Sequence, residues 1–242
     1  MGSVMSNKET PLNFSKRLEA VWLRNVSNYR ITKRTIVSNI GECCAKILAE
    51  PVKQLHPRTS TILQDVTIDD ADSLVVIHVP KKINLGGIIL DDGWAHLSVT
   101  DPTFSTDYPL YKSAQYDVGK VKFDPFYATG ATDASEVKNL ANYQVKVNLW
   151  FSPENSNCAI HNHDTNHEML EVHTQIFGVG RMQKFHKQEY ESIYEDVILG
   201  QGMTHVCFAG AKEDGSFYYP WHQYFADTDC IWMAIEYHRY RY

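Results

Sequence analysis

The sequence predicts a mainly β protein, a sandwich or closed barrel, preceded by a short helical extension. From about residue 57 onward, short segments rich in β-branched residues alternate with turn residues such as Asp69-Asp70 and Asp91-Asp92-Gly93. In the second half, Tyr143–Phe151 alternates apolar and polar residues, which is the pattern of a half-buried strand. Many short strands joined by short turns are typical of a sandwich or a barrel.

The first fifty residues have a different pattern, in which apolar residues recur at helical spacing. The two apolar runs are Leu18, Val21, Trp22 and Val26, and then Ile36, Val37, Ile40, Cys44, Ile47 and Leu48. Pro51 would end the second helix. We therefore expect an N-terminal helical extension over residues 1–50 and one β-barrel domain over residues 51–242. The apolar stripe of such helices also predicts a homo-oligomer, most simply a dimer.

The composition excludes several classes of protein. Hydrophobic residues make up 43% and charged residues 21% of the 242 residues, which excludes a wholly disordered chain. The net charge of −6 speaks against a nucleic-acid partner, because phosphate contacts need clustered Lys and Arg. No apolar run is long enough for a membrane helix, and the first ten residues lack the apolar core of a signal peptide. Five cysteines without a CxxC pair favour a reducing compartment, so we expect a cytoplasmic protein.

Histidine is the uneven feature of the composition, and it predicts a metal site. His161 and His163 are two residues apart on a predicted strand, so both imidazoles face the same side. His205 follows a glycine-rich turn and begins another predicted strand. With a carboxylate from Glu168 or Glu171, three neutral imidazoles form a set that suits divalent Fe, Mn, Ni, Cu or Zn. His167 is expected in an exposed turn and has no role in this set.

These residues resemble the two motifs of the cupin superfamily. His161 and His163 match the H-x-H of the first motif, G-x5-H-x-H-x3,4-E-x6-G, and Glu171 to Gly178 match its E-x6-G. Gly202 and His205 match the G-x-x-H of the second motif, G-x5-P-x-G-x2-H-x3-N. The resemblance covers residues 143–237. It implies a cupin-like double-stranded β-helix (jelly-roll) barrel whose metal ligands are His161, His163, Glu171 and His205.

The choice of carboxylate stays open at this point. Seven residues separate Glu171 from His163 where the motif has three or four, whereas Glu168 meets that spacing but misses the glycine. The two glutamates face opposite sides of a strand. Glu171 is preferred, and it places His173 and Gln175 on the inner face as a pocket wall. The alternative register turns another set inward, which would be an ordinary barrel core: Leu170, Val172, Thr174 and Ile176. If neither glutamate binds, a three-histidine site remains.

A centre of this kind supports two reactions on a small polar substrate. With Fe(II), the favoured metal, it predicts a mononuclear non-haem iron oxygenase of the dioxygenase type. A Lewis-acidic metal with a nearby base predicts an isomerase or epimerase instead. A third alternative is a ligand-binding cupin without turnover. Candidate catalytic residues are His173, Gln175 and His222, the last in an aromatic segment expected at the barrel mouth. Residues 101–142 are expected to cover that mouth.

Overall fold

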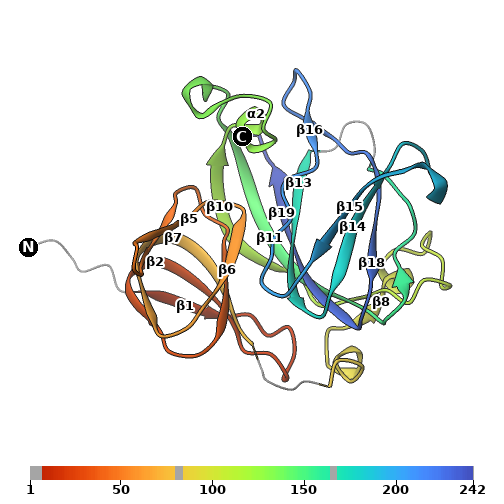
Figure 1. The fold of residues 1–242 in the computed structure, drawn as a ribbon, viewed down its shortest axis with the longest axis horizontal. Helices are drawn as coiled ribbons and strands as arrows, with labels where there is room; N and C mark the ends of the chain where they lie inside the picture. The colour runs from red at the N-terminus through yellow and green to blue at the C-terminus, as the bar shows by residue number, and fades with distance from the viewer. Residues whose placement is uncertain (1–6, 80–83, 164–167, 242) are drawn as a thin grey trace, which may run out of the picture.

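The computed structural model describes residues 7–79, 84–163 and 168–241, in which antiparallel sheets dominate (Figure 1). The first sheet contains only strands from the N-terminal third, in the order β1-β2-β7-β3-β6, with β4 paired to both β7 and β5. Its strands are β1 (Lys8–Pro11), β2 (Ala20–Ile31), β3 (Thr35–Asn39), β4 (Ala45–Leu48), β5 (Lys53–Leu55), β6 (Thr59–Leu63) and β7 (Val66–His78).

Two further sheets, formed by the rest of the chain, face each other. The central sheet has the order β13-β19-β11-β9-β8, with β10 also paired to β11, and the outer sheet has the order β12-β18-β14-β15. The central strands are β8 (Ala95–His96), β9 (Tyr111–Lys112), β10 (Tyr116–Phe123), β11 (Ala141–Ser152), β13 (Met169–Phe177) and β19 (Cys230–Arg239). The outer strands are β12 (Ser156–Asn157), β14 (Gly180–Phe185), β15 (Ile193–Leu199) and β18 (Trp221–Ala226).

The remaining elements are short. They are the hairpin β16 (Gly210–Ala211) and β17 (Phe217–Tyr218), the helices α1 (Leu97–Thr100) and α2 (Pro125–Ala128), and the 3-10 turns Ile88–Leu90, Ala134–Glu136 and Tyr190–Ser192. Among the described residues, then, no helix has the length and apolar character needed to cross a membrane. The prediction of a mainly β fold is confirmed.

The predicted N-terminal helical extension is wrong, and β2 shows why the pattern misled. Two residues of β2, Asn25 and Asn28, have positive φ and are skipped in the pairing with β7. A positive φ interrupts the extended backbone and breaks the two-residue alternation of the strand, although the register with β7 is the same on both sides of each asparagine. Leu23 and Val26, on either side of Asn25, therefore both point into one core, and their spacing of three imitates a helix.

The segment of the second predicted helix contains the strand β3 instead. The apolar pattern of β3 does not alternate, because the strand is buried on both faces. All five of its residues are buried. Ile36 belongs to the core shared with the central sheet, whereas Val37 belongs to a separate core inside the N-terminal sheet. Residue 50, where the helical extension was expected to end, lies between β4 and β5 of this sheet. The apolar residues that predicted a dimer are largely buried within the chain itself.

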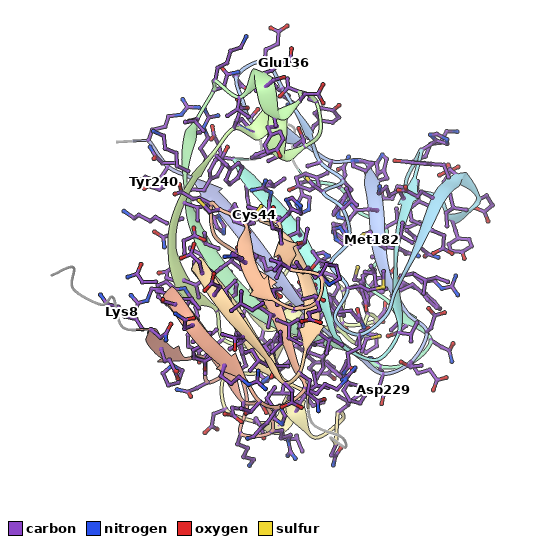
Figure 2. The ribbon with its side chains drawn as sticks, turned by 60° about the vertical axis from the view of Figure 1, so that its left-hand side comes forward. Lys8, Cys44, Glu136, Met182, Asp229 and Tyr240 are labelled. Carbon is purple, nitrogen blue, oxygen red and sulfur yellow. The ribbon has the colours of Figure 1, made fainter. Side chains whose placement is uncertain are left out.

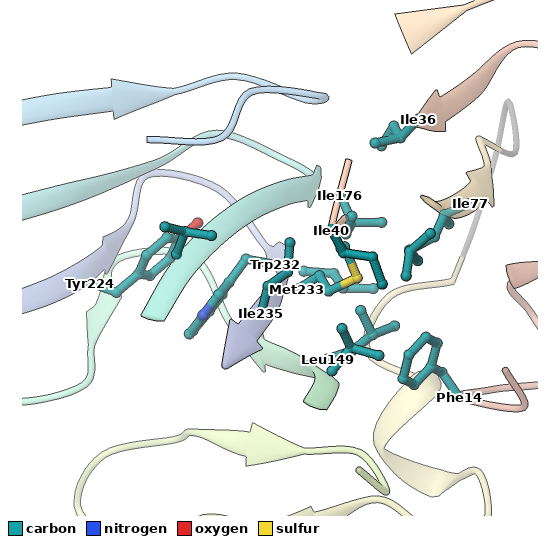
Figure 3. Packing of buried hydrophobic residues seen from close by; sticks show 14 of the residues in the cluster. Phe14, Ile36, Ile40, Ile77, Leu149, Ile176, Tyr224, Trp232, Met233 and Ile235 are labelled. Carbon is teal, nitrogen blue, oxygen red and sulfur yellow. The ribbon is translucent and has the colours of Figure 1, made fainter. Parts of the chain in front are cut away.

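The N-terminal sheet covers the face of the central sheet that points away from the outer sheet (Figures 1 and 3). Figure 3 shows Ile36, Ile40 and Ile77 of the N-terminal region facing Leu149 and Met233 of the central sheet, all in one cluster. The opposite face of the central sheet turns toward the outer sheet. There Trp232 of β19 stacks on Tyr224 of β18, with ring centroids 3.9 Å apart. The central strands are thus buried on both faces.

The loop between β15 and β16 also docks on the N-terminal sheet. The Ser60 hydroxyl of β6 donates to the Gly202 carbonyl at 2.8 Å and lies 2.6 Å from the Thr204 hydroxyl. Gly202 has φ +82°, and a Cβ there would lie 2.5 Å from Ile62 Cγ1. The glycine is required both for its backbone conformation and for the close approach of β6.

We predict that Gly202→Ala destabilises the protein more than Gly130→Ala does. Both glycines have positive φ, which costs an alanine about 1–2 kcal/mol. Only Gly202 faces a neighbour, and overpacking adds about 1–3 kcal/mol, whereas nothing lies within 4 Å of a Cβ at Gly130. Equilibrium urea unfolding of both variants measures the difference. Equal losses would show that the loop does not pack on β6 as described.

Candidate metal centre

Three histidine side chains meet between the central and outer sheets. His161 and His163 lie in the segment after β12, and His222 lies at the start of β18. Their candidate ligand atoms all lie within 4.8 Å of one another. The ring centroids of His161 and His222 are 4.3 Å apart, and those of His163 and His222 are 5.2 Å apart. Three of the described histidines could therefore hold one metal ion.

The backbone fixes two of these rings by direct pairing. His161 and His222 exchange two backbone hydrogen bonds, of 2.9 and 2.8 Å, in an isolated antiparallel bridge. The chain reaches this bridge through Ala159, which has φ +65° and whose N–H donates to the Asn157 side chain at 2.9 Å. A local turn and a strand start thus bring together residues that are far apart in sequence.

Carbonyl oxygens select the nitrogen that would face a metal. Nδ1 of His161 lies 3.0 Å from the Ala159 carbonyl, and Nδ1 of His222 lies 2.8 Å from the Pro220 carbonyl. A carbonyl only accepts hydrogen bonds, so each Nδ1 carries a proton and Nε2 is the nitrogen left for a metal. This is the outer-shell arrangement typical of ligating histidines.

Glu171 supplies an ionised carboxylate beside the three rings. Its Oε2 lies 3.8 Å from Nε2 of His163, and its Oε1 accepts a short hydrogen bond from Nε2 of His173. Burial raises the pKa of Glu171, but His173, His163 and His222 outweigh burial and hold that pKa well below its usual range. The carboxylate is therefore charged, and its charge favours a cation among the imidazoles.

The two paired histidines have opposite proton affinities. Burial lowers the pKa of His161, but Cys158, the Ala159 carbonyl and Glu171 outweigh it and raise that pKa to about 9. Burial and the neighbouring His161 lower the pKa of His222 well below its usual range. His222 therefore offers a free lone pair, whereas a metal at His161 would displace a proton.

The cluster opens into a pocket of about 530 Å³. The central sheet contributes Trp150 and Trp232 to its walls, and the outer sheet contributes Met182 and Tyr224. The loop from Leu97 to Leu110 closes one side. The part of the predicted covering segment around residues 101–110 therefore lies at this pocket.

The other predicted site residues take different places. His173 lines the same pocket, and Glu171 and His173 face inward, as the preferred register has them. Gln175 is not among the residues that line the pocket, contrary to the prediction. Its Oε1 accepts a hydrogen bond from the Tyr224 hydroxyl at 2.5 Å. Glu168 points away and pairs with Arg241 at 2.9 Å. His167 lies outside the described residues.

The structure does not bring His205 to the three histidines. It is buried beside His173, with ring centroids 5.1 Å apart, and its Nδ1 lies 2.8 Å from the Val206 carbonyl. His222 takes the third position instead. Gly215, Pro220 and His222 keep neither the spacing nor the second glycine of the second cupin motif, so matching that motif could not identify His222.

Comparisons with known proteins give structural likeness only. No protein-family model and no curated protein matches this sequence. Similar solved structures include a cupin 2 conserved barrel domain protein from Leptotrichia buccalis, with 8% identity, 98% of this chain and 91% of that chain covered, and a TM-score of 0.30. An oxalate decarboxylase of Bacillus subtilis has 10% identity, coverage of 99% and 77%, and a TM-score of 0.31. An oxalate oxidase in complex with the substrate analogue glycolate has 12% identity, coverage of 39% and 42%, and a TM-score of 0.27.

One of these solved structures is described as a cupin barrel protein, and the cupin superfamily is the one whose motifs the sequence resembles. At such identities and TM-scores they carry no information about the ligands or the reaction of this chain. Both have to be argued from its own side chains.

We predict that His205 weakens the protein in acid. Burial and the neighbouring His173 lower its pKa to about 3, from 6.5 for a free histidine. Between these values the unfolded chain binds a proton that the folded chain refuses, so stability falls as pH drops from 6.5 toward 3. The loss is up to about 1.4 kcal/mol for each pH unit. Urea unfolding across this range should give a flatter profile for His205→Gln. His186→Gln, at an exposed histidine, should keep the wild-type profile, and equal flattening in both variants would contradict the assignment.

Proposed function

We propose that this chain is a metal-dependent enzyme with a mononuclear divalent metal at His161, His163 and His222. The observation that carries the proposal is the paired Nδ1–carbonyl contacts of His161 and His222, which leave both Nε2 atoms for a shared ion. Glu171 stands beside them as a fourth ligand or as the counter-charge. The ligand set therefore differs from the sequence expectation in one member, with His222 in the place of His205.

The metal that we propose is Fe(II). Imidazole suits Fe, Zn, Cu and Ni alike, and carboxylate suits Mn, so the ligand types alone fit several ions. Histidines with one carboxylate and open coordination positions are the arrangement of non-haem iron oxygenases. When bound, such a metal supplies redox chemistry with dioxygen. We therefore place this protein among oxygenases of the dioxygenase type.

The pocket supports a small substrate with both apolar and polar parts. Trp150 and Trp232 stack nearly parallel with centroids 6.2 Å apart, and with Tyr224 they exclude water from one wall. Trp150 Nε1 is buried without a hydrogen-bond partner among the described residues, so it can donate to a substrate. Asn162 and Gln188 add polar side chains to the lining. The protein would hold and orient the substrate next to the metal while water is excluded.

His173 gives the second candidate, an isomerase, a specific basis. Its Nε2–H donates to Glu171, so in the neutral form of the ring Nδ1 would carry the lone pair. That Nδ1 is buried with no hydrogen-bond partner among the described residues, and His173 lines the pocket. A neutral imidazole in this position could accept a proton from a substrate that a Lewis-acidic metal polarises.

Replacing a proposed ligand should abolish tight metal binding. We expect His161→Ala and His222→Ala each to lower the affinity for Zn²⁺, a probe ion, by about 100-fold or more, since outer-shell partners alone are worth about 10–100-fold. Calorimetric titration of metal-free protein measures this. His186→Ala and His205→Gln should bind as the wild type does. Retention of Zn²⁺ by His222→Ala together with loss in His205→Gln would restore His205 as the third ligand.

The two glutamates form a matched pair in the same titration. Glu171→Gln should weaken binding because it removes the charge beside the rings, whereas Glu168→Gln changes an exposed group paired with Arg241. Equal effects of the two substitutions would remove Glu171 from the site. No effect of either would leave a three-histidine centre.

Dioxygen uptake separates the two proposed reactions. Protein purified without oxygen should contain iron, and it should consume dioxygen when small-molecule extract is added. His161→Ala should consume none. Zinc or manganese in the purified protein, together with an absence of dioxygen uptake, would overturn the oxygenase and leave the isomerase.

A further inference from the structure

A second pocket, of about 550 Å³, lies on the other side of His205 from the metal centre. It is bounded by residues 42–59 of the N-terminal sheet, residues 122–140 and residues 204–207. Figure 2 labels Cys44, one of the residues that line this pocket. Its size is in the range of small-molecule sites. No residue of the proposed metal set lines it.

One guanidinium group in this pocket is available to an anion. Arg58 lies over the Phe123 ring, 4.9 Å from its centroid, and makes no ion pair with any residue that the structure describes. Lys122 on the same lining likewise has no ion pair within the described ranges. An arginine positioned on an aromatic ring keeps its planar edge free for a carboxylate.

The acidic residues of the lining are already used by the backbone. The Asp124 carboxylate accepts the N–H groups of Phe126, Lys138 and Asn139 at 2.9, 2.9 and 2.7 Å. Glu42 Oε1 accepts the N–H of Lys122 at 2.7 Å. Neither carboxylate forms an ion pair with Arg58 in the part of the chain that the structure describes, so the guanidinium remains without an acidic partner from this lining.

Apolar side chains surround the entrance. Four exposed apolar residues line this pocket, with exposed fractions of 43, 39, 51 and 87%: Tyr127, Val137, Leu140 and Val206. A contiguous apolar rim around a charged group is typical of a ligand site. The rim would cover the apolar body of a ligand.

His205 supplies a hydrogen-bond acceptor in the wall. The side chain is 5% exposed, and its Nδ1–H donates a hydrogen bond to the Val206 carbonyl. Its Nε2 is buried without a hydrogen-bond partner among the described residues. A buried acceptor without a donor is costly, so a ligand hydroxyl that donates to it would be favourable.

We propose that this pocket binds a small organic carboxylate with an apolar body and a hydroxyl group. The carboxylate pairs with Arg58, the body packs on the rim, and the hydroxyl donates to Nε2 of His205. The site does not depend on the metal centre or on the reaction proposed for it.

The test is calorimetric titration of the metal-free full chain with para-hydroxybenzoate. Arg58→Gln should weaken binding by about tenfold or more, because it removes a charge-assisted hydrogen bond. Arg58→Lys should restore part of the affinity. Arg30→Gln is the matched control, since Arg30 lies on the same sheet and pairs with Asp65. If Arg58→Gln fails to fold, Leu140→Ser at the exposed rim replaces it as the test variant. Leu140→Ser should weaken the binding of para-hydroxybenzoate relative to Arg30→Gln, which remains the control.

Two comparisons give each part of the site its own readout. Benzoate lacks the hydroxyl, so His205→Phe should remove the preference for para-hydroxybenzoate over benzoate. The neutral para-hydroxybenzyl alcohol should bind more weakly than the acid to wild type and equally to Arg58→Gln. In the metal-free chain the alternative place for the carboxylate is the first pocket, which His161 lines. Loss of binding in His161→Ala but not in Arg58→Gln, or no saturable binding at millimolar concentration, would overturn the proposal.

Discussion

The burial of the central sheet on both faces is the constraint on which the rest of the structure depends. Leu149 and Met233 point to the N-terminal sheet and are fully buried there. The next residues along the same strands, Trp150 and Trp232, point the other way and form the wall of the metal pocket. Without the N-terminal sheet, a large apolar face would be exposed to water. The core between the N-terminal and central sheets thus holds in place the strands whose other face forms the pocket wall.

This double burial decides how much of the fold the sequence reveals. The strand β11 was predicted nearly to its ends, because its alternation of apolar and polar residues is strong. The N-terminal strands were not, because the positive-φ residues Asn25 and Asn28 in β2 and the two-sided burial of β3 remove that alternation. Propensity within a window cannot detect a partner sheet that comes from the same chain.

The same constraint explains the two registers of β13. Leu170, Val172 and Ile176 form a complete apolar face, and so they read as a barrel core. They are a core, but one that packs on the N-terminal sheet, where Thr174 lies 3.5 Å from the Ser38 hydroxyl. Glu171 and His173 are therefore left on the pocket side. Local pattern identified both faces, and only the tertiary arrangement says which face meets the pocket.

The glycine-rich turn at residues 200–204 shows how a motif can match for another physical reason. Gly202 is needed because β6 approaches it too closely for any Cβ, and Ser60 binds the same turn. The turn attaches the two parts of the molecule to each other. It also sets His205 between two pockets, beside His173 on one side and the Arg58 pocket on the other. His205 and His173 are therefore neighbours in the wall that separates the two pockets, and each pocket is lined by one of the two rings.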